Sequence, residues 1–283
     1  MNNELFYEVV FNPIEWTRCF CVSDVYIVQL LKKEFPYFCF EESDASGKTI
    51  CAKITADVEG YTFQDYESNA KFEKITGEEL LAIFGTVIFD LKNFNNDKFW
   101  FLHAGACVSD NNKLIVVVGP THAGKSTLIS QLIADNRFTY LTDDSLAYDK
   151  KKGKFIGFPR PISLRTTQFI ENKLQYSQFE QNGVKFWNLK NDYMSSGVKE
   201  YDEIIVFSIC REKNGTMDGP RVQKITPFGV MMLFIMNSLK GRQISENHMM
   251  ARQLCNDDSI SAFSVVGYEG DEAYEIICRK VFD

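Results

Sequence analysis

Apolar and polar positions repeat along the chain with two periods, and each period predicts a type of element. Alternating runs at 5–11 (LFYEVVF) and 49–57 (TICAKITAD) predict strands, and 24–35 (DVYIVQLLKKEF) predicts a helix between them. Thr76 and Glu79 form a capping-box sequence, so a second helix should begin there. An apolar stripe follows at helical spacing and predicts packing against a large surface; it consists of Leu80, Ile83, Phe84, Val87, Ile88 and Leu91.

The rest of the chain alternates strand-like and helix-like segments, the pattern of an α/β domain. Segment 98–109 (KFWFLHAGACVS) predicts a strand or strand pair, and a buried strand at 114–118 is followed by a helix over 125–134. Later strands are expected in 137–149, around a hairpin tip at 151–154, and at 202–210 and 260–268. Later helices are expected at 227–240, closed by Gly241, and at 271–282. Within the first of these, Met231, Met232 and Met236 are predicted to fill a core.

These elements predict an α/β fold in two parts. A small N-terminal α+β domain should span residues 1–75, and a domain built around the strand at 114–118 should span 76–283. Segment 166–200 is polar and irregular, with scattered aromatic residues. It is compatible with a substrate-facing loop or with a loosely packed excursion.

Composition narrows the classes of function. Thirty-one basic and 38 acidic residues give a net charge of −7, which disfavours nucleic acid or an anionic membrane as a partner. The eight cysteines lack C-x-x-C spacing and lie mostly in apolar runs, so buried free thiols are expected. No apolar run approaches the ~20 residues of a membrane helix, and no secretory leader is recognisable. We therefore expect a cytoplasmic protein.

The segment 119–126 (GPTHAGKS) matches the G-x-x-x-x-G-K-[ST] phosphate-binding loop, or P-loop, at every fixed position. A predicted strand precedes it and a predicted helix follows it, which is the context the motif requires. Lys125 is expected to reach the β and γ phosphates of ATP, and the Ser126 hydroxyl to ligate Mg²⁺. The expected nucleotide-binding residues are Gly119, Thr121, His122, Ala123, Gly124, Lys125, Ser126 and Thr127.

Two carboxylates, Asp143 and Asp144, end the strand predicted after the P-loop helix. In a parallel sheet that strand end lies beside the phosphates, where one carboxylate can hold Mg²⁺ and the other can accept a proton. We assign Asp143 as the base and Asp144, with Ser126, to the metal. A solvated turn or a helix cap that includes Ser145 is the alternative.

Three other residues are candidates near this site. His103 lies on the strand predicted before the P-loop strand, where it could be catalytic or a satisfied core histidine. Arg160 and Arg165 could clamp a phosphate or the acceptor, or could be surface residues.

The ordered set LHAGACVSDNNKLIVVVGPTHAGKST, YLTDD and GFPRPISLR resembles the HPr kinase-related P-loop kinases over about 102–165. The resemblance implies a P-loop kinase domain of the HPr kinase type. It implies that His103, Asp143 and Asp144 assist phosphoryl transfer to a serine hydroxyl. The glycine-rich E-x-R-G-L-G segment of true HPr kinases is absent from 166–200, so HPr as substrate and phosphorylase activity are not implied. The layout is similar to kinases that phosphorylate a serine of a natural-product precursor peptide.

The leading hypothesis is an ATP- and Mg²⁺-dependent kinase that acts on a Ser or Thr hydroxyl of a peptide or protein. A kinase of a small molecule such as free serine, and a non-catalytic nucleotide switch, are the alternatives. A homo-oligomer is compatible with the sequence, which does not decide the oligomeric state.

Overall fold

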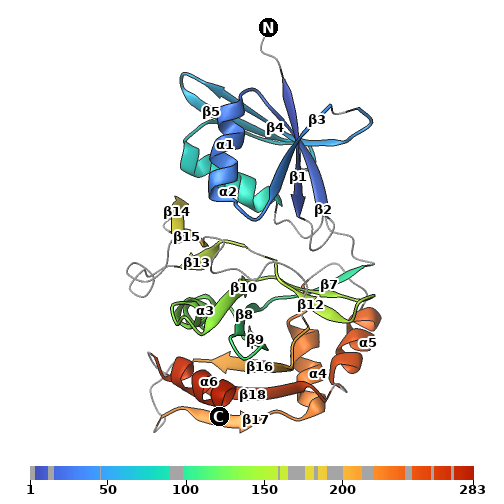
Figure 1. Cartoon of the computed structure of the whole chain (residues 1–283), viewed down its shortest axis with the longest axis vertical. Coiled ribbons are helices and arrows are strands. Elements are labelled where there is room, and N and C mark those ends of the chain that lie inside the picture. Colours follow the sequence, from blue (N-terminus) through green and yellow to red (C-terminus); the bar gives the residue numbers. More distant parts are fainter. Residues whose placement is uncertain are drawn as a thin grey trace. The chain divides into compact units, whose positions relative to one another are not determined.

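The computed structural model describes most of the chain, and its contacts divide into two compact units (Figure 1). The first unit is Met1–Phe94 with Gln175–Asp192, and the second is Asn95–Leu174 with Tyr193–Asp283. Both strands and helices are present, so the predicted mixed α/β class is confirmed. No helix of the described part is long and apolar enough to cross a membrane. The described residues are 4–11, 16–44, 46–88, 98–158, 160–164, 176–181, 184–189, 200–211, 219–239, 244–255, 258–268 and 271–283.

In the described residues, the N-terminal part of the first unit contains a six-stranded sheet and the helices α1 and α2. The strand order is β3-β1-β2-β4-β5-β6, and the pairing is antiparallel except between β2 and β4. The predicted strands 5–11 and 49–57 and helix 24–35 are present as β1, β4 and α1. The bounds are β1 Leu5–Phe11, β2 Trp16–Val22, α1 Val25–Glu34, β3 Cys39–Ser43, β4 Ile50–Asp57, β5 Gly60–Asp65, β6 Ala70–Ile75 and α2 Gly77–Ile88.

Helix α2 belongs to the first unit because of its apolar stripe. Phe84 is fully buried, with its ring centroid 5.1 Å from that of Phe20, 5.3 Å from that of Phe35 and 6.2 Å from that of Phe40. Aromatic pairs at such distances contribute beyond their buried area. The sequence had assigned this helix to a second domain that begins at residue 76, so the compact unit extends further along the chain than the predicted domain.

A two-stranded hairpin occupies part of the segment predicted to be irregular. Strands β14 (Tyr176–Gln181) and β15 (Val184–Leu189) pair antiparallel, with Tyr176 opposite Leu189 and Gln181 opposite Val184. The prediction of irregular structure over 166–200 is therefore wrong for these two stretches. Tyr176 and Phe179 are three residues apart, and Phe186 and Trp187 are adjacent, so the aromatic residues show no period of two that would have predicted these strands.

The second unit is built on a mixed six-stranded sheet of order β10-β8-β9-β16-β18-β17. Strands β9, β16 and β18 are parallel, whereas β8 runs antiparallel to both β9 and β10. The bounds of its elements are β7 Phe99–Leu102, β8 Gly105–Ser109, β9 Lys113–Val118, α3 Lys125–Ile133, β10 Phe138–Thr142, β11 Leu146–Asp149, β12 Lys154–Ile156, β13 Ile162–Leu164, β16 Glu203–Cys210, β17 Arg221–Lys224, α4 Pro227–Met236, α5 Ile244–Cys255, β18 Ile260–Val266 and α6 Glu272–Phe282.

The direction of these strands positions the candidate site. Two successive antiparallel pairings, β9 with β8 and β8 with β10, leave β10 pointing the same way as β9. The carboxyl ends of β9, β10 and β16 therefore meet at one edge of the sheet. The sheet is mixed and β8 lies between β9 and β10, but the end of β10 reaches the edge at which the sequence placed Asp143 and Asp144.

Helices α4 and α5 share a core with one face of this sheet and with the small sheet β12-β11-β7. Alternate residues of β9, Leu114, Val116 and Val118, point into this core. Helix α3 packs against β8, β10 and α6 (Figure 1). The apolar character of β9 on both faces is thus explained by helices on both sides of the sheet.

Helix α4 departs from the prediction in two respects. It ends at Met236, with Asn237 as its C-cap, and Gly241 lies outside the described residues. Met232 and Met236 are 38% and 75% exposed, so the prediction that they fill a core is wrong; only Met231 packs against the core. The helix is apolar all round, so its sequence does not indicate which face is buried.

The capping box of α2 provides a test of the first unit. Glu79 N–H donates to Thr76 Oγ1 at 3.2 Å, and Thr76 N–H donates to Glu79 Oε2 at 2.8 Å. Thr76→Ala should lower the free energy of unfolding by about 1 kcal/mol and speed amide hydrogen exchange in the first turn of α2. Thr86→Ala, at an exposed position of the same helix, is the control and should leave that exchange unchanged, since alanine is the better helix former. Equal effects of the two substitutions would contradict the cap.

Candidate functional site

The P-loop connects β9 to α3 in a conformation that requires glycine at its first position. Gly119 has φ 158° and Gly124 has φ 94°, and His122 between them also has a positive φ of 69°. A Cβ on Gly119 would lie 2.4 Å from the carbonyl oxygen of Ile209, so a side chain there would displace β16. The predicted strand, loop and helix are confirmed at this place.

Lys125 begins α3 and points its amine back over the loop. Its Nζ donates to the carbonyl oxygens of Gly119 at 3.0 Å and Pro120 at 3.3 Å. Burial lowers the pKa of Lys125, while the charges of Asp144 and Asp143 oppose that shift. The lysine therefore adds a poorly solvated positive charge to the positive end of α3, an environment that favours an anion.

Asp143 follows β10 and is buried, with 1% of its surface exposed. Its Oδ1 accepts a hydrogen bond from Ser126 Oγ at 3.1 Å, and its Oδ2 accepts a long one from the Ser163 N–H at 3.4 Å. Burial, and next the charge of Asp144, raise the pKa of Asp143 to about 7. A strand, β11, follows rather than a helix, so Asp143 is neither a solvated turn residue nor a helix cap.

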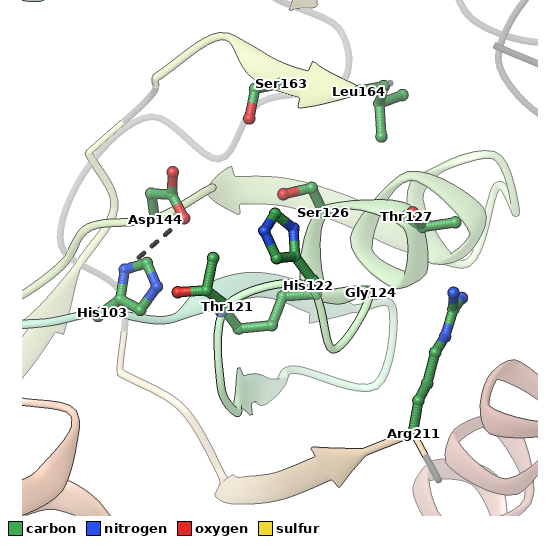
Figure 2. Close-up of a pocket in the computed structure, with 11 residues that line it drawn as sticks. His103, Thr121, His122, Gly124, Ser126, Thr127, Asp144, Ser163, Leu164 and Arg211 are labelled. Carbon is green, nitrogen blue, oxygen red and sulfur yellow. Dashed lines mark ion pairs between the residues drawn. The ribbon is translucent and has the colours of Figure 1, made fainter. Parts of the chain in front are cut away.

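Asp144 adopts a left-handed backbone conformation with φ 67°, which turns its side chain away from that of Asp143. Its side chain is 37% exposed and points toward His103, with 3.7 Å between Asp144 Oδ1 and His103 Nδ1 (Figure 2). Burial and the charge of Lys125 lower the pKa of His103 despite the opposing effect of Asp144. The imidazole is therefore mainly neutral at neutral pH, and its contact with Asp144 is not a full ion pair.

His103 lies between β7 and β8 and not within a strand, so its predicted position on a strand is wrong. The residue breaks the apolar run into two strands, and its N–H donates to the carbonyl oxygen of Asn237 at 2.6 Å. This hydrogen bond connects the turn between β7 and β8 to the C-terminal end of α4. The turn presents His103 at the sheet edge where β10 ends.

Lys125, Asp144 and His103 line one cavity of about 390 Å³, within the range of ligand pockets, whereas Asp143 does not line it. Among the predicted nucleotide-binding residues, Gly119 and Ala123 do not line the cavity. Of the two predicted arginines, Arg160 does not line it either, and Arg165 lies outside the described residues. The lining residues are His103, Thr121, His122, Gly124, Lys125, Ser126, Thr127, Asp144, Ser163, Leu164 and Arg211 (Figure 2).

Arg160 is held behind the site. Its Nη1 donates to Ser145 Oγ at 3.3 Å, and its N–H donates to the carbonyl oxygen of Phe158 at 2.8 Å. Its positive charge opposes the rise in the pKa of Asp143. Its role as a clamp that touches a ligand stays a prediction that these contacts do not favour.

The sequence analysis did not identify Arg211 or Tyr268. Arg211 directly follows β16, and the Tyr268 hydroxyl donates to the carbonyl oxygen of Ala123 in the P-loop. The rule that ligands bind at the carboxyl ends of parallel strands would have pointed to Arg211 once β16 was placed beside β9. For Tyr268 the sequence contained no such signal, because its contact joins residues far apart in the chain.

No family model matches the chain, and no curated protein matches it. Among solved structures, the chain is similar to one titled "Structure of the Hpr(Ser) kinase/phosphatase from Coxiella burnetii". The match has 14% sequence identity and a TM-score of 0.32, and it covers 64% of this chain and 89% of that one.

The burial of Asp143 predicts how the stability of the folded protein depends on pH. The folded state holds a proton on Asp143 up to about pH 7, whereas an unfolded aspartate loses it near pH 4, so this group lowers stability as pH rises between these values. Without nucleotide or metal, Asp143→Asn should therefore raise the melting temperature at pH 8, by about 2–4 °C for each kcal/mol gained, and by less at pH 5.

Asp149→Asn is the matched control. Asp149 is also fully buried, but its Oδ1 accepts the N–H groups of Lys151 and Lys152, both at 2.9 Å. Asparagine weakens these charge-assisted bonds, so this variant should melt at a lower temperature than wild type. A melting temperature for Asp143→Asn below that of wild type at pH 8 would show that the charge of Asp143 is not costly.

Proposed function

We propose that this protein is an ATP- and Mg²⁺-dependent kinase with a P-loop domain of the HPr kinase type, which transfers the γ-phosphate to a Ser or Thr hydroxyl of a peptide or protein. The observation that carries the proposal is the composition of the cavity. The P-loop lysine and the first turn of α3 line it together with Asp144, whose carboxylate lies beside the neutral imidazole of His103. Phosphoryl transfer needs both, a positive cradle for the phosphates and an acceptor for the hydroxyl proton.

The residues present fit a magnesium ion. Ser126 Oγ and Asp143 Oδ1 are 3.1 Å apart, and both are the hard oxygen donors that Mg²⁺ prefers. Mg²⁺ usually uses one or two protein ligands together with phosphate oxygens and water, so a dedicated cage of carboxylates is not needed. When bound, the ion would neutralise charge on the transferred phosphate. It would also offset the cost of the Asp143 charge.

The positions of the two aspartates favour a division of roles opposite to the one assigned from sequence. Asp143 is buried and bonded to Ser126, so we propose that it serves the metal side. Asp144 lines the cavity beside His103, so we propose that it receives the proton of the acceptor hydroxyl. We propose that His103 orients Asp144. Because the imidazole is neutral, it leaves the carboxylate its negative charge and so its ability to accept a proton.

The acceptor class follows from the resemblance of the ordered motifs and not from the cavity. Segment 166–200, which would distinguish a peptide groove from a lid over a metabolite, lies largely outside the described residues. We propose a peptide or protein acceptor, with a precursor peptide of natural-product biosynthesis as the first to try. Incubation of the protein with Mg²⁺-ATP and peptides encoded beside its gene, followed by mass spectrometry, tests this directly.

Asparagine substitutions at the two aspartates should impair phosphoryl transfer in different ways. Asp144→Asn should bind Mg²⁺-ATP normally but transfer phosphate about 10²- to 10⁴-fold more slowly at every Mg²⁺ concentration, as expected for a lost base. Asp143→Asn should require more Mg²⁺ and recover part of its rate when Mg²⁺ is raised. The measurement is the initial rate of peptide phosphorylation as a function of Mg²⁺ concentration.

Lys125→Ala provides the reference for nucleotide binding. It should abolish stabilisation of the protein by ATP, since a ligand that binds only the folded state raises stability by RT ln(1 + [L]/Kd). An unchanged stabilisation would refute the P-loop proposal. Near wild-type transfer by both asparagine variants, on a peptide that wild type phosphorylates, would refute the catalytic roles while leaving nucleotide binding intact.

A further inference from the structure

Arg211 projects into the cavity from the end of β16, the strand next to β9. Its side chain reaches up beside Gly124 and Thr127, on the opposite side of the cavity from His103 and Asp144 (Figure 2). A Cβ on Gly124 would lie 3.0 Å from Arg211 Nη2, so the guanidinium passes close over the loop where the glycine has no side chain. Arg211 thus approaches the first turn of α3 directly.

The guanidinium is held in this place by an aromatic ring. It lies over the ring of Tyr268, 5.7 Å from the centroid, and Tyr268 is 4% exposed. The hydroxyl of the same tyrosine donates to the carbonyl oxygen of Ala123. One buried side chain therefore fixes both the arginine and the P-loop, which keeps the distance between them constant.

The charges around Arg211 indicate what it binds. Its guanidinium lies against Gly124, the N-cap of α3, and Lys125 lines the same cavity, so the charge of Arg211 adds to a cavity that already holds positive groups. Among the described residues, no carboxylate forms an ion pair with Arg211, and Asp144 lies across the cavity. An arrangement of this kind is stabilised by an anion between the positive groups, and guanidinium geometry suits phosphate.

We infer that Arg211, positioned by Tyr268, binds the phosphates of the nucleotide that do not react, the α and β groups. The inference rests on the proposed function and deepens it. Ser126 and Asp144 define the end of the cavity where the γ-phosphate reacts, and Arg211 lies beside Thr127 at the other end. A residue there binds the ground state and the transition state alike, so it sets nucleotide affinity and not the rate of transfer.

Titration calorimetry with Mg²⁺-ADP and with a non-hydrolysable ATP analogue tests this. Arg211→Ala should weaken both ligands equally, by about 10- to 100-fold, as expected for the loss of charge-assisted hydrogen bonds. Arg211→Lys should recover part of the affinity, because lysine keeps the charge without the planar fork. Arg221→Ala, at an exposed position of β17, is the matched control and should bind both ligands as wild type does.

The kinetic constants give a second readout. Arg211→Ala should raise the KM for ATP with kcat unchanged, and Tyr268→Phe should raise it less, since the ring remains while the bond to Ala123 is lost. A variant that binds ADP as tightly as wild type, or that loses kcat at saturating ATP, would overturn the inference. Lys125→Ala distinguishes a failure of this inference from a failure of the proposed function. If Lys125→Ala binds nucleotide as tightly as wild type, the proposed function itself is wrong.

Discussion

The hydrogen bond from Ser126 Oγ to Asp143 Oδ1 connects the two halves of the candidate site. Ser126 lies in the first turn of α3, which follows β9, and Asp143 follows β10; β8 lies between β9 and β10 in the sheet. The bond forms because two antiparallel pairings return β10 to the direction of β9. Without that return the carboxylates would lie at the opposite edge of the sheet, away from the P-loop. The strand order is therefore the constraint from which the chemistry of the cavity follows.

Asp143 and Asp144 are adjacent in sequence but occupy different environments. The left-handed conformation of Asp144 turns the chain after β10, so one carboxylate is buried behind Ser126 and the other faces the cavity. Burial penalises a charge, whereas exposure leaves it free to exchange a proton. The same dipeptide thus provides a group suited to a metal and a group suited to an acceptor hydroxyl. Such a division by environment recurs in enzymes with paired carboxylates.

The sequence predicted those parts of the fold whose signals are local. The strand and helix that flank the loop 119–124, and the capping box at Thr76, each depend on a few neighbouring residues, and each is confirmed. The antiparallel strand β8, the stacking of Arg211 on Tyr268 and the exposure of Met236 depend on which elements pack together. No periodicity within one segment contains that information. The candidate aspartates could be found because they follow a strand, but their roles depend on which one is buried.

The distribution of charge in the cavity connects the proposed role of Arg211 in nucleotide binding with the proposed role of Asp144 in proton transfer. Lys125, Arg211 and the first turn of α3 supply positive charge along the loop, and Asp144, beside a neutral histidine, lies across the cavity from Arg211. The phosphates of a nucleotide would be attracted to the loop, because they carry the complementary charge. An acceptor hydroxyl is uncharged, so it gains little from that field and needs a proton acceptor instead. The two substrates are therefore best accommodated at opposite ends, with the γ-phosphate between them. In the proposed mechanism, repulsion from Asp144 would keep the other phosphates on the side of Arg211, so nucleotide binding and proton transfer would be assigned to different residues.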